Sequence, residues 1–432
     1  MDNSKSTIGM PVEQGFYTLI LGIKPEGAKI IYFYDESDKR ANGCMIYGVS
    51  IHESISDMIP TCKVEVEVPY TWIDNQCITD GTLISIDMKI NESIAEGIKE
   101  KNLNENAYIF RLFKIDKLED HGIFVKLSLH GVIDFMDGYG DANKLNCACT
   151  TSKVFNTCAD EFKFPDKDID TTKDKQLWIA NGRTIYQFLT YCCQYGYMDD
   201  TSAMMWAIDR NKKLYYKNIV KCFDCNKAAS NCANGNCSGG GCLNIRVGSY
   251  GVPVVTHVPF GINNVQLGGY GANGDAFKLV DGESCKYDYN FVRADNLTKT
   301  SESTCVCKNC GFSNPQDWFP FDVGNHHEKY FKAAIQNRQV LSTYSTFMSI
   351  QFTPSTGLVA KNSIVPFFEA FHLFDACNIE YDVHADNGQY TKMAALTTKA
   401  MVETIDVSIT QKYAATKIKF VTQGFNTKGK TN

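Results

Sequence analysis

The chain has 432 residues, of which 44% are hydrophobic and 21% charged, and its formal net charge is −6. This length exceeds one ordinary hydrophobic core and predicts roughly two to four domains. The composition is that of a globular protein, and no apolar run reaches the ~18 residues of a membrane span. The negative net charge argues against general electrostatic binding of nucleic acid, although local basic patches remain possible.

The N-terminal stretch MDNSKSTIGMPVEQG lacks the charged and apolar regions of a secretory signal. Nothing in the sequence therefore directs secretion, and we expect the chain to fold in a reducing cytoplasm.

Residues 15–138 are composed almost entirely of short β-prone runs separated by glycine, proline and asparagine. The clearest strand is residues 63–68, where valines and charged residues alternate strictly. Six or seven strands at intervals of about a dozen residues predict a closed barrel or a sandwich. The predicted strands are residues 16–23, 29–34, 45–51, 61–68, 81–90, 107–115 and 123–135.

The middle of the chain predicts a helix followed by a hairpin. The polar composition of residues 141–175 marks a domain boundary. Apolar residues at helical spacing predict a helix from about residue 182 to residue 195, with Gly196 as its left-handed terminator. Two strands, residues 204–208 and 214–220, follow it, separated by a polar turn. On pattern alone this is an ordinary α+β packing element.

The C-terminal part returns to β character after a helix predicted at residues 328–344. The chain as a whole is predicted to be α+β and predominantly β, with two β-barrel domains flanking or enclosing a mixed domain. The expected units are a first barrel at 1–139, an α+β domain at 140–330 that shares strands with the second barrel in one arrangement, a second barrel at 331–424 and a disordered tail at 425–432. The predicted C-terminal strands are residues 347–352, 379–383, 402–410 and 417–421.

Eighteen cysteines are the unusual feature of the composition. Those within apolar segments are expected to act as small hydrophobic side chains; they are Cys44, Cys62, Cys77, Cys192, Cys193 and Cys377. A second set lies in glycine- and asparagine-rich segments near residues 221–243 and 304–311, which hold too little apolar surface to fold without a cross-link.

Two CxxC pairs in these segments have the spacing that lets two thiolates converge on one Zn²⁺. Cys222, Cys225, Cys307 and Cys310 form the candidate first zinc site. Cys232, Cys237, Cys242 and Cys305 form a candidate second site or disulfides. Disulfides or free thiols are the alternatives for both sets.

Other motifs do not indicate catalysis or a cofactor. The GxxxxGK[ST] match at residues 424–431 ends one residue before the last and has no following helix to hold a phosphate. The GxGxxG match at residues 269–274 precedes no convincing helix, and the adjacent His326 and His327 would point to different helix faces. The sequence has no GxSxG elbow and no distinguishable acid pair.

The helix–hairpin segment resembles the central segment of baseplate hub proteins of contractile phage tails. The resemblance rests on NGRTIYQFL at residues 181–189, YGY at 195–197, WAID at 206–209 and KLYY at 213–216. Similar strand patterns occur in VSIHESISDMIPTCKVEV at residues 49–66 and in IKFVTQG at 418–424. The resemblance covers most of the chain through strand patterns rather than chemical motifs.

This resemblance implies a virion protein that forms a homotrimeric ring between the tail tube protein and the central spike protein, in contact with other baseplate proteins. Two tube-type barrels in each of three subunits would match a hexameric tube. The expected role is structural and not enzymatic, with assembly in the host cytoplasm, no membrane, and DNA only as cargo passing through the channel. The cysteine-rich insertion is not part of the family pattern.

Two other functions remain open from the residues. The first is a zinc-stabilised structural or binding module of another large assembly, which would lose partner binding on metal removal and would not form threefold rings. The second is a tail-borne cell-wall hydrolase, which requires a catalytic acid pair that the sequence does not single out.

Overall fold

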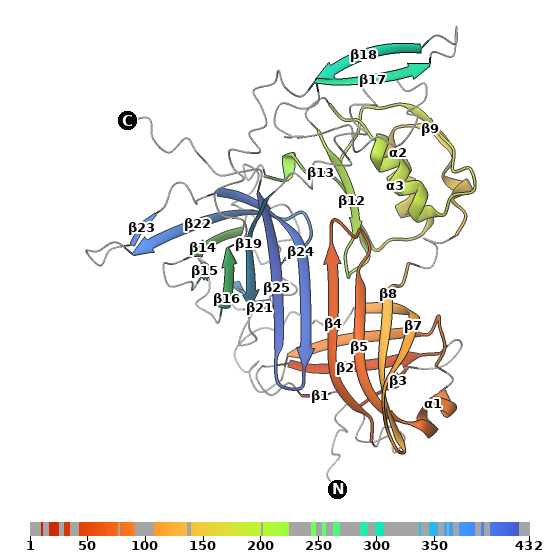
Figure 1. Cartoon of the computed structure of the whole chain (residues 1–432), viewed down its shortest axis with the longest axis vertical. Helices are drawn as coiled ribbons and strands as arrows, with labels where there is room; N and C mark the ends of the chain where they lie inside the picture. The colour runs from red at the N-terminus through yellow and green to blue at the C-terminus, as the bar shows by residue number, and fades with distance from the viewer. Residues whose placement is uncertain are drawn as a thin grey trace.

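Strands dominate the computed structural model of the chain, and most of them belong to one large sheet (Figure 1). The structure describes residues 10–11, 17–25, 30–34, 43–76, 78–90, 108–135, 140–199, 202–223, 243–247, 253–255, 262–267, 286–292, 299–305, 337, 345–352, 358–360, 363–365, 371–384, 390–392 and 398–422. The prediction of a predominantly β chain with a mixed α+β middle is confirmed.

The N-terminal part of this sheet is antiparallel and follows the order β1-β2-β6-β7-β8-β5-β4. Its strands are β1 (Met10–Pro11), β2 (Tyr17–Lys24), β3 (Ile31–Tyr32), β4 (Met45–Ser54), β5 (Thr61–Pro69), β6 (Leu83–Ile90), β7 (Tyr108–His121) and β8 (Phe124–Ile133). The alternation in residues 63–68 places Val64, Val66 and Val68 at 0% exposure, as predicted.

One helix in this part was not predicted. Helix α1 (Tyr70–Gln76) follows β5 directly, and its Trp72 packs on Phe33 with ring centroids 4.9 Å apart. Its seven residues are too few to show a helical period in the sequence, which is why pattern analysis missed it.

The long strand β24 (Thr398–Thr410) joins the N-terminal and C-terminal β segments into a single sheet. It pairs with β25 (Ala414–Thr422) along one edge. Its other edge pairs first with β22 (Ala376–His384), over residues 398–401, and then with β4, over residues 404–410. Figure 1 shows β4, β24 and β25 side by side.

The remaining strands extend the sheet or form small hairpins. Strands β14 and β16, from the middle of the sequence, pair with the C-terminal strands β22 and β19. Hairpins β17–β18 and β20–β21 form separate two-stranded sheets, and β23 pairs with β22. The bounds are β14 (Leu243–Val247), β15 (Pro253–Val255), β16 (Ile262–Leu267), β17 (Lys286–Val292), β18 (Lys299–Cys305), β19 (Ser345–Phe352), β20 (Leu358–Ala360), β21 (Ser363–Val365) and β23 (Tyr390–Lys392).

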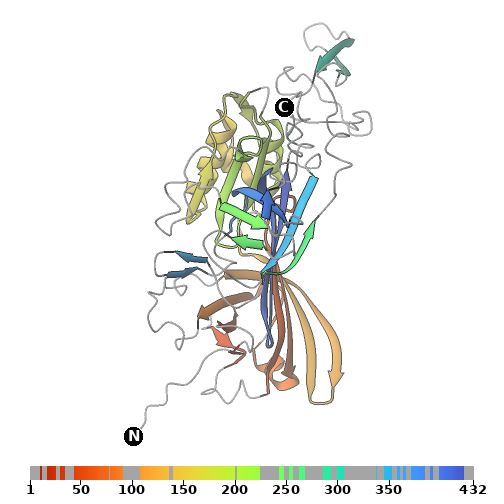
Figure 2. The ribbon, with the colours of Figure 1, turned by 90° about the vertical axis from the view of Figure 1, so that its left-hand side faces the viewer.

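Two closed barrels were predicted, but among the described residues the path of strand pairing runs from β1 to β15 without closing. The physical reason is the shared edge of β24, because a strand that pairs with both β22 and β4 merges the two β segments. Figure 2 shows the sheet edge-on, with the α+β domain above its N-terminal part.

The middle of the chain, residues 140–199 and 202–223, folds as the α+β domain. Helices α2 and α3 pack beside a three-stranded sheet of order β10-β13-β12. The elements are η4 (Ala142–Leu145), β9 (Cys147–Cys149), α2 (Thr151–Glu161), β10 (Asp166–Ile169), β11 (Gln176–Trp178), α3 (Ile185–Tyr195), β12 (Met204–Ile208), β13 (Lys213–Asn218) and η5 (Lys221–Phe223).

Helix α3 confirms the predicted helix with a later start. Thr184 caps its N-terminus and forms a capping box with Gln187. The apolar stripe is buried: Ile185, Phe188, Leu189 and Cys192 are each at most 1% exposed. The following hairpin, β12 and β13, also lies where it was predicted.

The predicted left-handed terminator at Gly196 was wrong. Gly196 has an extended backbone, with φ −64° and ψ 132°. The side-chain amide of Asn337 satisfies the helix end instead, donating to the carbonyls of Cys193, Gln194 and Gly196 at 2.9, 3.0 and 2.8 Å. Glycine is needed here for space, because a Cβ would collide with the Tyr216 hydroxyl.

No helix in the described part of the chain is long and apolar enough to cross a membrane. Several predicted features lie outside the described residues: the helix at 328–344 except Asn337, the glycine motifs at 269–274 and 424–431, and the tail at 425–432.

Candidate functional site

A buried polar junction joins the α+β domain to both β segments. At its centre Arg210, in the turn between β12 and β13, is 1% exposed and contacts Glu53 of β4, which is also 1% exposed. The Arg210 backbone N–H donates to Glu53 Oε2 at 2.8 Å, and Nη2 donates to the Phe371 carbonyl at 3.3 Å. The guanidinium also lies 5.9 Å from the Tyr108 ring centroid. One side chain therefore contacts three separate parts of the chain.

The turn that presents Arg210 is built by Asp209. Its Oδ1 accepts hydrogen bonds from the backbone N–H of Asn211 at 2.8 Å and of Lys213 at 2.9 Å. Its Oδ2 accepts from the Tyr215 hydroxyl at 3.2 Å. An aspartate that caps its own turn in this way fixes the backbone on both sides of Arg210.

The C-terminal side of the junction carries two more titratable groups, His372 and Asp375, which are half-buried. The backbone N–H of His372 donates to Asp375 Oδ2 at 2.8 Å, and His372 Nδ1 lies 3.8 Å from Asp209 Oδ2. Burial raises the pKa of Asp375 to about 6. Burial lowers the pKa of His372, but Asp209 and Asp375 favour the protonated ring, and the net shift is upward.

Burial also raises the pKa of Glu53, and the nearby Arg210 acts in the opposite direction. Desolvating two charges is expensive, so such a pair is retained only where its geometry is well satisfied. The junction therefore fixes position rather than adding large net stability.

A second buried acid, Glu403, lies where β24 changes partner from β22 to β4. It is 3% exposed and accepts hydrogen bonds from Ser54 Oγ at 3.1 Å, Ser56 Oγ at 2.7 Å and Lys419 Nζ at 3.0 Å. Burial raises the pKa of Glu403, but hydrogen bonds from Thr404, Ser56 and Lys419 outweigh it and lower the pKa. Through these hydrogen bonds Glu403 of β24 connects to β25 and to the end of β4.

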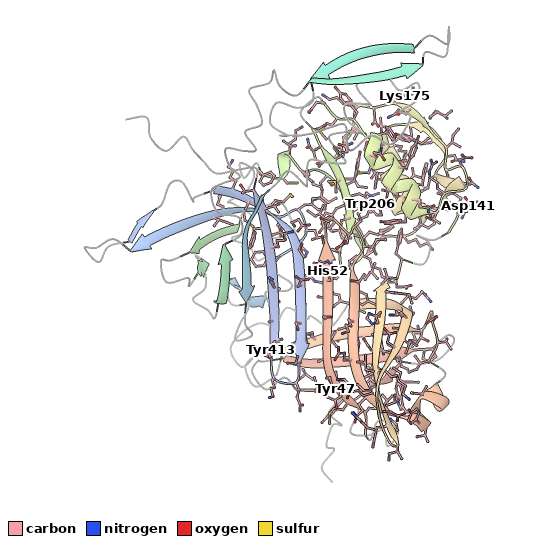
Figure 3. The ribbon with its side chains drawn as sticks, in the orientation of Figure 1. Tyr47, His52, Asp141, Lys175, Trp206 and Tyr413 are labelled. Atoms are coloured by element: carbon pink, nitrogen blue, oxygen red, sulfur yellow. A yellow bond between two sulfur atoms is a disulfide. The ribbon has the colours of Figure 1, made fainter. Side chains whose placement is uncertain are left out.

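His52 lies on the solvent-exposed face of the sheet, where β4 pairs with β24. Its Nδ1 lies 2.5 Å from Asp406 Oδ1 across the β4–β24 ladder, and its Nε2 lies 2.8 Å from Asp57 Oδ2. Hydrogen bonds to Asp406 and Asp57 outweigh partial burial and raise the pKa of His52 to about 9. Figure 3 shows His52 at the level where the sheet meets the α+β domain.

Of the predicted zinc ligands, only Cys222 has a described side chain. It lies half-buried in η5, its thiol donates to the Asn218 carbonyl at 3.5 Å, and burial raises its pKa. Cys305 ends strand β18. Cys225, Cys232, Cys237, Cys242, Cys307 and Cys310 lie outside the described residues. No group of three metal-binding side chains occurs among the described residues, so the zinc sites stay a prediction.

The other cysteines are placed more fully. Cys62, Cys192, Cys193 and Cys377 are buried free thiols and Cys44 is half-buried, as expected for small hydrophobic residues. Cys77 lies outside the described residues. Cys147 and Cys149 form a disulfide within β9, which the sequence analysis did not predict.

The residues of the junction were not predicted as a site. Arg210 was part of an ordinary polar turn, and its partner Glu53 lies 157 residues earlier. The sequence gives no local signal for this role, because Glu53 is followed in β4 only by Ser54, and the burial of both polar residues is set by the fold.

Comparison with solved structures finds tail proteins among those that are similar to this chain. No family model matches the chain, and no curated protein matches its sequence. The 43 kDa tail protein of prophage MuSo2 from Shewanella oneidensis is 11% identical with a TM-score of 0.47, covering 94% of this chain and 98% of that one.

Two further structures extend the comparison. A tail protein from Neisseria meningitidis is 8% identical with a TM-score of 0.46, covering 94% of this chain and 96% of that one. A structure of the Francisella PdpA–VgrG complex is 11% identical with a TM-score of 0.42, covering 94% of this chain and 58% of the matched chain.

Proposed function

We propose that this chain is a structural protein of a contractile phage tail: a baseplate hub that joins the tail tube to the central spike as a homotrimeric ring. The proposal is supported by the resemblance of residues 181–216 to hub proteins. The observation that carries it is the shared strand β24, which joins β4 on one edge and β25 on the other. Two β segments fused in this way form one stiff unit.

Such a unit suits a protein that transmits force through a ring. Two tube-type β segments in each of three subunits present six similar units to a hexameric tube, and the threefold axis matches a trimeric spike. The α+β domain, held by Arg210, lies at the periphery, where it meets other baseplate proteins.

The wet face of the sheet supports DNA as passing cargo rather than as a bound ligand. Several of its described lysines are paired with carboxylates of the same face, as in Lys63–Glu65 at 2.6 Å and Lys114–Asp116 at 2.8 Å. Lysines that are neutralised in this way are less available to phosphates. The protein then works by interface geometry and not as an enzyme, and it acts as a virion component.

The alternative is a zinc-stabilised structural or binding module of another assembly, favoured by the two CxxC pairs at residues 222–225 and 307–310. Chelation separates the two proposals. The alternative predicts loss of partner binding without any threefold assembly, whereas the hub predicts a trimer.

The hub is tested by mass measurement in solution with its neighbours. Purified protein mixed with the tube and spike proteins of the same phage is expected to give complexes built on three copies of the 48.3 kDa chain. A chain that stays monomeric in the presence of both partners contradicts the proposal.

A further inference from the structure

The disulfide of β9 joins two cysteines that are separated by a single residue. The Cα atoms of Cys147 and Cys149 are 5.5 Å apart, and only Ala148 lies between them. Successive side chains of a strand point to opposite faces, so both sulfurs lie on the same face of β9. A disulfide stabilises a fold mainly by restricting the unfolded chain, and this effect is smallest for the shortest loops. The bond therefore contributes little to holding the domain together.

Hydrogen bonds position β9 independently of the disulfide. The strand pairs antiparallel with β11. The Trp178 indole, which is 1% exposed, donates to the Cys149 carbonyl at 3.1 Å, and the Ala180 N–H donates to Asn146 Oδ1 at 2.7 Å. Immediately after the strand, Thr150 caps the N-terminus of α2. The sulfur–sulfur bond can therefore open while these contacts keep the strand in place.

The two sulfurs of β9 differ from neighbouring thiols in their exposure. Cys147 and Cys149 are half-buried, whereas Cys158, Cys192 and Cys193 of the same domain are buried free thiols. Burial raises the pKa of each of these three thiols, which suppresses the reactive thiolate. Exposed disulfides exchange with external thiols more readily than buried ones. Thiol chemistry in this part of the domain is thus directed to β9.

We propose that Cys147 and Cys149 form a thiol-exchange site, at which a small thiol of the glutathione class opens the disulfide to a dithiol in the folded domain. A glutathione thiolate attacks one of the two sulfurs, the bond between them breaks, and the other sulfur leaves as a thiolate and takes up a proton. A second glutathione thiolate then attacks the mixed disulfide and releases the first sulfur. The products are the dithiol and oxidised glutathione, and the reverse exchange with oxidised glutathione closes the bond again. The site does not require the chain to be a baseplate hub.

Tryptic mapping after equilibration with glutathione tests the site. The tryptic peptide 145–153 contains Cys147 and Cys149 and no other cysteine, and the next peptide, 154–163, contains only Cys158. The folded chain is equilibrated with reduced or with oxidised glutathione, treated with N-ethylmaleimide, and then denatured and digested. We expect peptide 145–153 to carry two maleimide groups after reduced glutathione and an internal disulfide after oxidised glutathione. Cys158, as the internal control, should stay unlabelled in both.

Three results of this mapping would overturn the proposal. The first is a disulfide that persists in reduced glutathione, and the second is a dithiol that persists in oxidised glutathione. The third is labelling of Cys158 together with opening of the bond, because the domain would then have to unfold before the disulfide reacts.

Single-cysteine variants provide the second arm. In Cys149→Ser no neighbouring thiol remains to expel a bound glutathione, so treatment with oxidised glutathione should leave one glutathione on peptide 145–153. The matched control is Cys44→Ser, which removes a half-buried free thiol of the N-terminal part and should open and close the β9 disulfide like the natural chain. Peptide 145–153 of Cys149→Ser without a glutathione adduct would contradict access of glutathione to the site.

Discussion

Arg210 illustrates how one side chain fixes the positions of three segments. Replacing it with methionine leaves Glu53 buried without a cation, and we expect a loss of about 3–5 kcal/mol in the free energy of unfolding. Denaturant unfolding measures this loss. The double variant Arg210→Met/Glu53→Gln should recover part of it, because it removes the unpaired charge.

The control for this prediction is an exposed ion pair of the same domain. Lys144 and Glu161 lie 3.0 Å apart with 71% and 43% of their side chains exposed. Lys144→Met should change the free energy of unfolding by less than about 1 kcal/mol. An Arg210→Met variant that behaves like this control would show that the junction is not structurally important.

Gly196 is a second residue whose role comes from space. Gly196→Ala places a methyl group against the Tyr216 hydroxyl, and we expect a destabilisation of about 1–3 kcal/mol from overpacking. Thermal unfolding of Gly196→Ala, Tyr216→Phe and the double variant forms a cycle. The double variant should be more stable than the sum of the two single changes predicts; strict additivity would argue against the collision.

The cysteine clusters give a prediction about metal. If the pairs at Cys222 and Cys307 share a thiolate site, protein purified without chelator should contain at least one equivalent of zinc. Elemental analysis measures the content, with a variant carrying serine at Cys307 and Cys310 as the comparison. Less than about half an equivalent in the natural chain contradicts the zinc site and favours disulfides or free thiols.

At the scale of elements, His52 at the pairing of β4 with β24 predicts that the free energy of unfolding depends on pH. The folded-state pKa of His52, about 9, lies above its ordinary value of 6.5. Its contribution to stability is therefore fully present below pH 6.5 and is lost as the pH rises through 9. The free energy of unfolding of the natural chain should fall between pH 6.5 and 9 by more than that of His52→Gln. Equal slopes for the two proteins would contradict protonation of His52 in the folded state.

Individual strands were predictable because their signal is local. The alternation of Lys63 to Val68 requires one buried face, and the structure buries all three valines. The α3 helix and the hairpin after it were likewise encoded by short-range spacing. Helix α1 was missed because it is too short to show a period.

The ends and joins of these elements depend on residues far away in the sequence. Gly196 was expected to close α3 by a left-handed turn, but Asn337, 141 residues later, caps the helix instead. Glu53 and Arg210 were unremarkable in sequence because each acquires its role only from the other. Strand pairing between β4 and β24 is of the same kind, since no local pattern specifies a partner some 350 residues away.

At the scale of the whole molecule, the two predicted barrels become one merged sheet with an α+β domain attached at a buried junction. The merging matters for the proposed role, because force applied to either β segment passes through β24 rather than through a flexible linker.

Electron microscopy of the protein assembled with its tube and spike proteins tests the central claim most directly. We predict ring-shaped particles with threefold symmetry that place the tube on one face and the spike on the other, with the α+β domains at the rim. Particles that contain a single copy of the chain, or rings without a threefold axis, would contradict the account.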